Sequence, residues 1–302
     1  MIVRVLGSAA GGGVPQWNCA CANCEAARDG RAPRRTQSSL AVSADGARWL
    51  LLNCSPDIAA QIEAFPPLHP PAPRGTPIAG MLLTDANVDH VGGLAVLRQR
   101  GGRDGFVIHS SATIREIATA QAAFAPFAAP PHRWLDAPLG EPLASDSDEH
   151  LAGNALTVTA IEVPGTTPGY AGRRPAPGAV VAYEITDPRS NEPLLFAPVF
   201  SAIDESLRAA IARASVAFLD GSFYSDDELV EANLLAKRSR ALGHQPVGGR
   251  DGTLAQLKGT RTRIVFTHLN NSNPMLDADS DAYAALREFG AELGYDGMEL
   301  RL

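Results

Sequence analysis

The sequence predicts an α/β protein in which two β-sheets pack face to face with helices outside, an αββα four-layer sandwich. Three features favour this fold. Segments 39–43 and 48–52 flank an Asp45-Gly46 turn, a pattern typical of a β-hairpin. Strand-like and helix-like segments then alternate, and consecutive strand-like segments return between residues 156 and 196. Paired strands around an alternating segment fit two packed sheets better than one doubly wound parallel sheet.

Hydrophobic periodicity and turn residues place the elements along the chain. Short apolar or β-branched runs predict strands at 2–6, 39–43, 48–52, 78–83, 106–109, 156–163, 180–185, 194–196, 216–219, 263–266 and 298–302. Apolar residues at helical spacing predict helices after Ser55, with Ile58, Ile62 and Phe65 on one face, and at 91–98, 113–123, 204–213 and 281–289. Residues 125–154 are rich in Pro, Ala and Asp and indicate a surface excursion, so we expect 1–302 to form one domain.

The composition excludes several classes of protein. The chain has 302 residues, 45% of them apolar and 20% charged, with a formal charge of −7. These values are typical of a globular protein. The acidic balance argues against a nucleic-acid partner, because phosphate contacts need a basic face. No apolar run approaches the roughly 20 residues that span a bilayer, and no secretory leader is visible, so we expect a cytoplasmic protein.

Three of the four cysteines lie close together, at Cys19, Cys21 and Cys24. A disulfide between two of them would close a very small loop, so the cluster is more typical of metal binding. Three thiolates can bind one tetrahedral metal ion together with a fourth ligand from elsewhere in the chain. A site with four protein ligands leaves no position open for substrate and is therefore structural. His244 is the candidate fourth ligand. The alternative is three free or redox-active thiols in a loop.

Asp89 and His90 follow an apolar strand and precede a helix directly. A strand end is a usual place for ligands, because side chains there project from a rigid edge. The alternative is an Asx-type turn in which Asp89 only caps the helix.

Two further strands end in residues of the same kind. One delivers His268 into an asparagine-rich turn, and another ends at Asp220 before Gly221. Taken singly, the alternatives are a structural histidine and a simple turn former. Three strand ends that carry Asp or His together indicate one shared site.

Residues 84–90, Thr-Asp-Ala-Asn-Val-Asp-His, resemble the T-H-x-H-x-D-H signature of the metallo-β-lactamase superfamily, a strand-end motif for two metal ions. The cysteine loop, Thr267-His268 and residues 295–299 resemble one branch of it, which includes the cyclic phosphodiesterase of phosphonate catabolism. In that branch a Cys-x-Cys-x-x-Cys loop and a distant histidine hold a structural zinc, and His244 matches that histidine.

The chain is more similar still to the PqqB family of pyrroloquinoline quinone (PQQ) biosynthesis. This resemblance rests on residues 11–19, 84–90, 243–246, 268–274 and 295–299, and therefore extends over nearly the whole chain. It implies a metallo-β-lactamase-like fold.

The departures from the hydrolase signature concern one of its two metal sites. Asp85 and Asn87 replace the two leading histidines. The third ligand and the bridging carboxylate would fall near residues 163–166 and 198–200, which contain no histidine or acidic residue. The resemblance therefore implies one remaining site of Asp89, His90 and His268, with Asp220 as an extra ligand or an outer carboxylate.

Two histidines and one carboxylate with open positions are the ligand set of non-haem Fe(II) oxygenases. In the PQQ pathway a cross-linked Glu-Tyr peptide is trimmed and its tyrosine ring is oxidised. The resemblance thus implies an Fe(II)- and O₂-dependent hydroxylase, an oxidoreductase acting on the tyrosine moiety, with Zn(II) at the cysteine site. We expect the substrate's amino-acid groups to be bound by Asp85, Asn87, Asn270, Asn271 and Asn273.

Two other functions stay open at this point. One is a non-catalytic carrier in the transport of PQQ or its precursor to the periplasm, which is consistent with a degraded metal site. The other is a mononuclear metallohydrolase that trims the peptide. The partner is a PQQ-related small molecule in each case, and the sequence leaves the oligomeric state open, a homodimer included.

Overall fold

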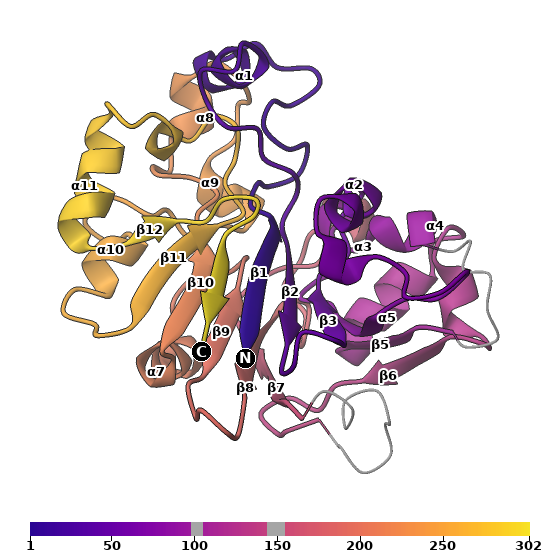
Figure 1. Ribbon diagram of the computed structural model, residues 1–302. Helices are drawn as coiled ribbons and strands as arrows, with labels where there is room; N and C mark the ends of the chain where they lie inside the picture. The colour runs from indigo at the N-terminus through magenta and orange to yellow at the C-terminus, as the bar shows by residue number, and fades with distance from the viewer. Residues whose placement is uncertain (98–104, 144–154) are drawn as a thin grey trace.

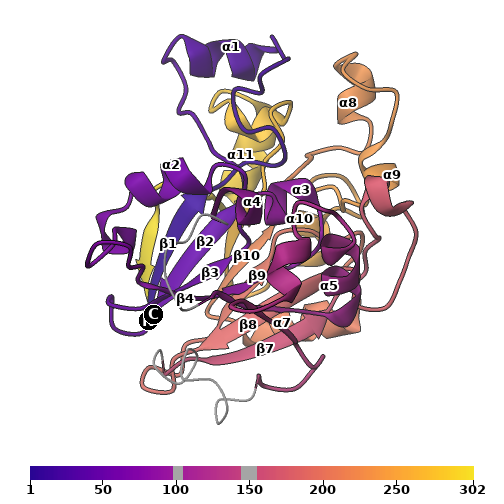
Figure 2. The same cartoon turned by 90° about the vertical axis from the view of Figure 1, so that its right-hand side faces the viewer.

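The computed structural model describes residues 1–97, 105–143 and 155–302, so Arg98 of the helix expected at 91–98 and residues 144–154 of the expected excursion lie outside the described part. The described strands form two sheets, shown in Figure 1 and, turned by 90°, in Figure 2. The first has the order β13-β1-β2-β3-β4-β5-β6, and the second has the order β12-β11-β10-β9-β8-β7.

Each expected strand is present with similar bounds, and β6 and β12 are additional strands. The strands are β1 (Ile2–Gly7), β2 (Ser39–Ser43), β3 (Trp49–Leu52), β4 (Ile78–Leu82), β5 (Val107–Ser110), β6 (Arg133–Asp136), β7 (Thr157–Glu162), β8 (Val181–Thr186), β9 (Leu194–Ala197), β10 (Val216–Asp220), β11 (Arg263–Thr267), β12 (Glu292–Leu293) and β13 (Glu299–Arg301).

Most helices are short and lie outside the sheets. They are α1 (Ala22–Arg28), α2 (Ile58–Glu63), α3 (Val88–Val91), α4 (Gly93–Leu97), α5 (Ala112–Thr119), α7 (Glu205–Arg213), α8 (Glu228–Glu231), α9 (Ser239–Leu242), α10 (Thr253–Gln256) and α11 (Asp281–Phe289), with 3-10 turns η1 (Pro66–Leu68), η2 (Ala125–Ala128), η3 (Gly169–Ala171) and η4 (Pro274–Leu276). Among the described residues no helix combines the length and the apolar character needed to cross a bilayer.

Both sheets are mixed. The predicted hairpin is confirmed, because β2 and β3 pair antiparallel with Leu40 opposite Leu52. From β3 to β6 the neighbouring strands are parallel. In the second sheet β7, β8 and β9 are antiparallel, whereas β9 to β12 are parallel.

The main core lies between the two sheets. Tyr183, Phe196 and Phe218 of the second sheet are buried in one apolar cluster with residues of β1 to β5. Alternate residues such as Leu195 point to the opposite face, where they pack with Leu207 of α7 and with α11. Figure 1 shows α7, α10 and α11 outside the second sheet and α2 to α5 beside the first. The predicted αββα sandwich is therefore confirmed.

A few local expectations are wrong. Part of the expected excursion is the edge strand β6, which the pattern misses because Trp134 is its one buried residue. Ser55 does not cap α2. Its hydroxyl contacts Gln61, and Asp57 occupies the N-cap without a side-chain bond. The helix expected from residue 91 starts earlier, as α3, and continues as α4.

Candidate metal centre

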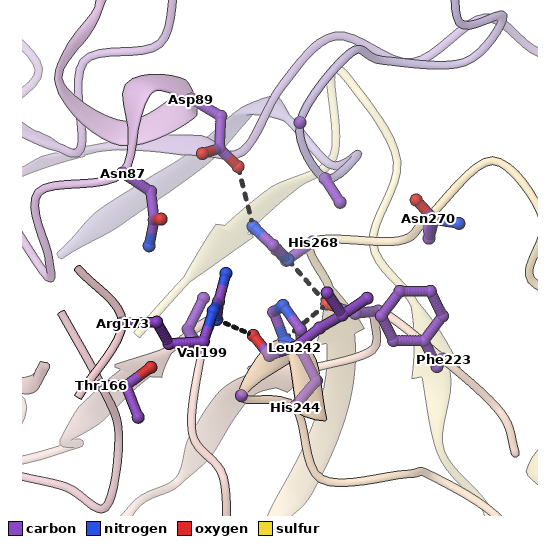
Figure 3. Close-up of a pocket in the computed structure, with 14 residues that line it drawn as sticks. Asn87, Asp89, Thr166, Arg173, Val199, Phe223, Leu242, His244, His268 and Asn270 are labelled. Carbon is purple, nitrogen blue, oxygen red and sulfur yellow. Dashed lines mark hydrogen bonds and ion pairs between the residues drawn. The ribbon is translucent and has the colours of Figure 1, made fainter. Parts of the chain in front are cut away.

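The candidate site lies where β4, β10 and β11 end. Asp89 and His90 belong to α3 just after β4, Asp220 is the last residue of β10, and His268 follows β11. Because β10 and β11 are parallel with Asp220 opposite Thr267, Asp220 and His268 emerge at the same end of the sheet. Asp89 and His268 border a cavity of about 200 Å³, shown in Figure 3.

Asp89, His90 and His268 converge on one point. Their ligand atoms lie within 4.8 Å of one another. The Asp89 Oδ2 atom is 3.1 Å from His268 Nε2 and 3.8 Å from His90 Nε2. The Nε2 atom of His90 is buried and makes no hydrogen bond within the described structure. A buried nitrogen left without a partner beside a carboxylate and a second imidazole fits a metal ion.

The other ring nitrogen of His90 is held by Asp85. The Asp85 Oδ2 atom is 2.6 Å from His90 Nδ1, and both side chains are fully buried. A carboxylate behind a ligating histidine fixes the tautomer and leaves Nε2 free for a metal. The side chain of Asp85, an expected substrate contact, is buried, contacts His90 and Asn87, and does not line the cavity.

The charges of this group are coupled. Burial opposes the charged form of His90, but Asp85 and Asp89 outweigh it and raise the pKa of the imidazole to about 9. Burial also opposes ionisation of Asp89, and the charge of His90 and the hydrogen bond with His268 outweigh it, so that the pKa of Asp89 is lowered. The site therefore holds ionised carboxylates able to meet a cation.

His268 is positioned by Ser222, a residue that the sequence analysis does not single out. The Ser222 hydroxyl is 2.6 Å from Asp220 Oδ1 and 2.7 Å from His268 Nδ1. When the hydroxyl donates to the carboxylate it accepts from Nδ1–H, which leaves the Nε2 of His268 facing Asp89. His268 has a left-handed backbone with φ 57°, so the chain turns sharply at this position.

His244 lies with Asp220, and the expectation that it completes the cysteine site is wrong. Its Nδ1 is 2.8 Å from Asp220 Oδ2, and its ring stacks on His268 with centroids 5.5 Å apart. Asp220 is buried and also bonds Ser222, so it acts here as an outer carboxylate. Asp220, His244 and His268 nevertheless form a second group whose ligand atoms lie within 4.8 Å.

The three cysteines converge as expected, but the residue beside them is Asn271. Its Nδ2 lies 3.1 Å from Cys19 Sγ and 3.4 Å from Cys21 Sγ. The ligand atoms of Cys19, Cys21 and Cys24 lie within 4.8 Å of one another. Burial and the neighbouring thiols raise the pKa of Cys24 to about 11, whereas for Cys21 hydrogen bonds from Cys24 and Asn271 outweigh burial and lower the pKa. The side chain of Asn271 thus lies directly beside the thiols of Cys19 and Cys21.

The five expected substrate contacts divide into two sets. Asn87 and Asn270 line the cavity (Figure 3), whereas Asp85, Asn271 and Asn273 do not. Asn273 is fully buried, donates to the carbonyl of Gly221 and caps η4, so its role is structural. Two further residues line the cavity, Thr166 and Arg173. Thr166 lies in the segment 163–166 where the resemblance expects a missing ligand, whereas no sequence pattern marks Arg173, because it comes from the irregular loop after β7.

Comparison with known proteins identifies the family of the chain. Residues 48–269 match the family described as the beta-lactamase superfamily domain. The chain is therefore a member of the metallo-β-lactamase superfamily. A new diphosphatase from the PhnP family, 16% identical, has a TM-score of 0.69 over 100% of this chain and 97% of that chain, which shows the fold alone.

Relatives of higher sequence identity show which family of this superfamily the chain belongs to. A protein of Azotobacter vinelandii named coenzyme PQQ synthesis protein B is 39% identical over 100% of both chains. The crystal structure of Zn(2+)-bound PqqB from Methylobacterium extorquens is 38% identical, covers 100% of both chains and has a TM-score of 0.91. The chain belongs to the PqqB family, as its resemblance predicts.

Proposed function

We propose that this protein acts in PQQ biosynthesis as an Fe(II)- and O₂-dependent hydroxylase, with Asp89, His90 and His268 as the iron ligands. Full-length similarity to coenzyme PQQ synthesis proteins supports the pathway. The convergence of two imidazoles and one carboxylate, with one buried imidazole nitrogen unpartnered, supports the metal centre. Iron bound by such a set keeps open positions for O₂ and substrate and supplies the oxidising chemistry.

The wall beside these ligands argues against a two-metal hydrolase. Asn87, Thr166 and Val199 line this wall of the cavity. They lie at the positions where a two-metal hydrolase carries a histidine of the signature, its third histidine ligand and its bridging carboxylate. An amide, a hydroxyl and an isopropyl group do not supply the imidazoles and bridging carboxylate that a second zinc would need. The donor set therefore favours one ion.

The remaining cavity residues would bind and orient the substrate. The side chains of Asn87 and Asn270 offer amide donors and acceptors to amino and carboxyl groups. Asp220 engages Nδ1 of His244, which leaves Nε2 as the nitrogen that can hold or move a proton beside the reacting ring. Phe223 covers one side of the cavity with an apolar ring that excludes water.

We also propose that Cys19, Cys21 and Cys24 hold a structural Zn(II), with Asn271 beside it in place of the expected His244. The three converging thiols, with the Asn271 amide beside them, support the binding of zinc at this place. Because Asn271 and His268 share one turn, the ion would also steady the backbone that presents His268.

The proposal is tested by loading the protein with Fe(II) under anaerobic conditions and adding O₂ and an amino acid with a tyrosine-derived ring. Hydroxylation inserts one oxygen atom into a ring C–H bond and reduces the other to water, so the assay supplies ascorbate as a two-electron donor. We expect O₂ uptake with a product heavier by one oxygen atom. His90→Ala and His268→Ala should lose both iron and O₂ uptake, whereas His69→Ala, at an exposed loop histidine, should keep them.

Other results would refute the hydroxylase. Peptide hydrolysis without O₂ uptake would indicate the mononuclear hydrolase. If the iron-loaded protein binds PQQ tightly but shows no O₂ uptake with the tyrosine-derived substrate, the result would indicate the carrier.

A further inference from the structure

We propose that Arg173 forms a carboxylate-binding subsite in the wall of the metal cavity, so that the site selects carboxylate-bearing ligands. The proposal rests on the function proposed above and names the ligand chemistry that the same cavity recognises. Figure 3 shows the Arg173 side chain among Asn87, Thr166 and Val199, with its guanidinium directed into the cavity.

The loop that carries Arg173 is held in place. The Tyr170 hydroxyl donates to the carbonyl of Ala86 at 2.5 Å, which joins the loop to the turn that presents Asn87. Across the loop, Thr167 N donates to the carbonyl of Arg174 at 2.9 Å. These contacts place Arg173 before a ligand arrives, so little ordering is left for binding.

The guanidinium has donors to spare. Its NH1 group donates to the carbonyl of Leu242, and within the described residues no carboxylate forms an ion pair with it. The two arginines of the α9 segment differ, since Arg238 pairs with Asp227 and Arg240 with Asp251. An arginine at a cavity wall with no acidic partner is suited to an anionic ligand.

Gly243 lies beside the guanidinium, where it ends α9 with a left-handed backbone of φ +94°. A Cβ atom there would be in ordinary contact with Arg173 NH1, at 3.4 Å, and with the Thr166 hydroxyl, at 3.5 Å, so the backbone of Gly243 and the Thr166 hydroxyl both border the guanidinium. The flat fork of arginine and the nearby hydroxyl and amide donors match the two oxygens of a carboxylate.

The surroundings also favour a ligand larger than a simple anion. The cavity shares Gly11, Phe223, Leu242 and Asn270 with an adjoining hollow of about 630 Å³. A ligand can therefore place one carboxylate at Arg173 and extend the rest of its framework toward this hollow. A carboxylated aromatic compound of the size of PQQ meets these requirements.

The experiment measures the binding of PQQ, a tricarboxylate, and of PQQ trimethyl ester to the zinc-loaded protein by quenching of tryptophan fluorescence. Arg173→Gln should weaken PQQ binding about tenfold or more, because hydrogen bonds to a charged group are lost. It should leave binding of the ester unchanged. Arg173→Lys should lie between, since lysine keeps the charge but lacks the fork. Metal content measured in each variant shows that the metal centre is intact.

Arg174→Gln is the matched control. The Arg174 guanidinium donates to the carbonyls of Ala171 and Gly172 and does not line the cavity, so PQQ affinity should stay at the wild-type value. Equal PQQ affinity of Arg173→Gln and Arg174→Gln would overturn the subsite, and so would a wild type without saturable PQQ binding. Both results concern PQQ binding only. The hydroxylase proposal is tested independently, by O₂ uptake.

Discussion

Replacing Ser222 by alanine tests how the metal centre is positioned. The Ser222 hydroxyl lies between Asp220 Oδ1 and His268 Nδ1 at 2.6 and 2.7 Å, and it is 3.1 Å from His244 Nδ1. Ser222, Asp220 and His268 are all buried. Ser222→Ala therefore removes the acceptor that holds the Nδ1–H of His268, and water has little access to replace it.

The size of the effect follows from these contacts. Leaving a buried donor unsatisfied costs about 1–3 kcal/mol. Removing a partner behind a metal-ligating histidine typically lowers metal affinity about 10–100-fold, which corresponds to about 1.4–2.7 kcal/mol. The two estimates agree, so we expect Ser222→Ala to bind the metal of the Asp89 site about 10–100 times more weakly.

The assay is competition with a chromophoric chelator, read separately for the iron and zinc sites. Ser222→Thr keeps the hydroxyl and should recover most of the affinity. Ser43→Ala removes another buried hydroxyl, on β2 and bonded to the carbonyl of Arg48, and should leave metal affinity unchanged. Wild-type affinity in Ser222→Ala would refute the tautomer argument for His268.

Two further predictions concern stability. Cys21→Ser should lower the Tm by at least about 5 °C, because a structural zinc contributes folding free energy, and a melting curve equal to that of the wild type would contradict the closed zinc site. Burial raises the pKa of Glu228 from its ordinary value of 4.5 to about 7, so between these pH values the native state keeps a proton that the unfolded state releases. The contribution of Glu228 to the free energy of unfolding is thus full below about pH 4.5 and falls by at most about 3 kcal/mol as the pH rises through 7. Glu228→Gln should be stabilised relative to wild type at pH 8 but not at pH 4.5 in urea unfolding, and a pH-independent difference would contradict the raised pKa.

Much of the framework was predictable from the sequence because its signals are local. Alternating or continuous apolar runs mark the strands, and the Asp45-Gly46 turn marks the hairpin. The strand ends then locate Asp89, His90 and His268, since the parallel strands of each sheet present their carboxyl ends at one edge.

The partners of the polar residues depended on the tertiary structure. His244 belongs to a segment without hydrophobic periodicity, so only its packing against β10 shows that it meets Asp220. Asn271 reaches the cysteine loop across 250 residues of chain, and Arg173 reaches the cavity through an irregular loop. Periodicity specifies which face of a strand or helix is buried, whereas a polar side chain in a loop acquires its partner only when distant segments fold against it.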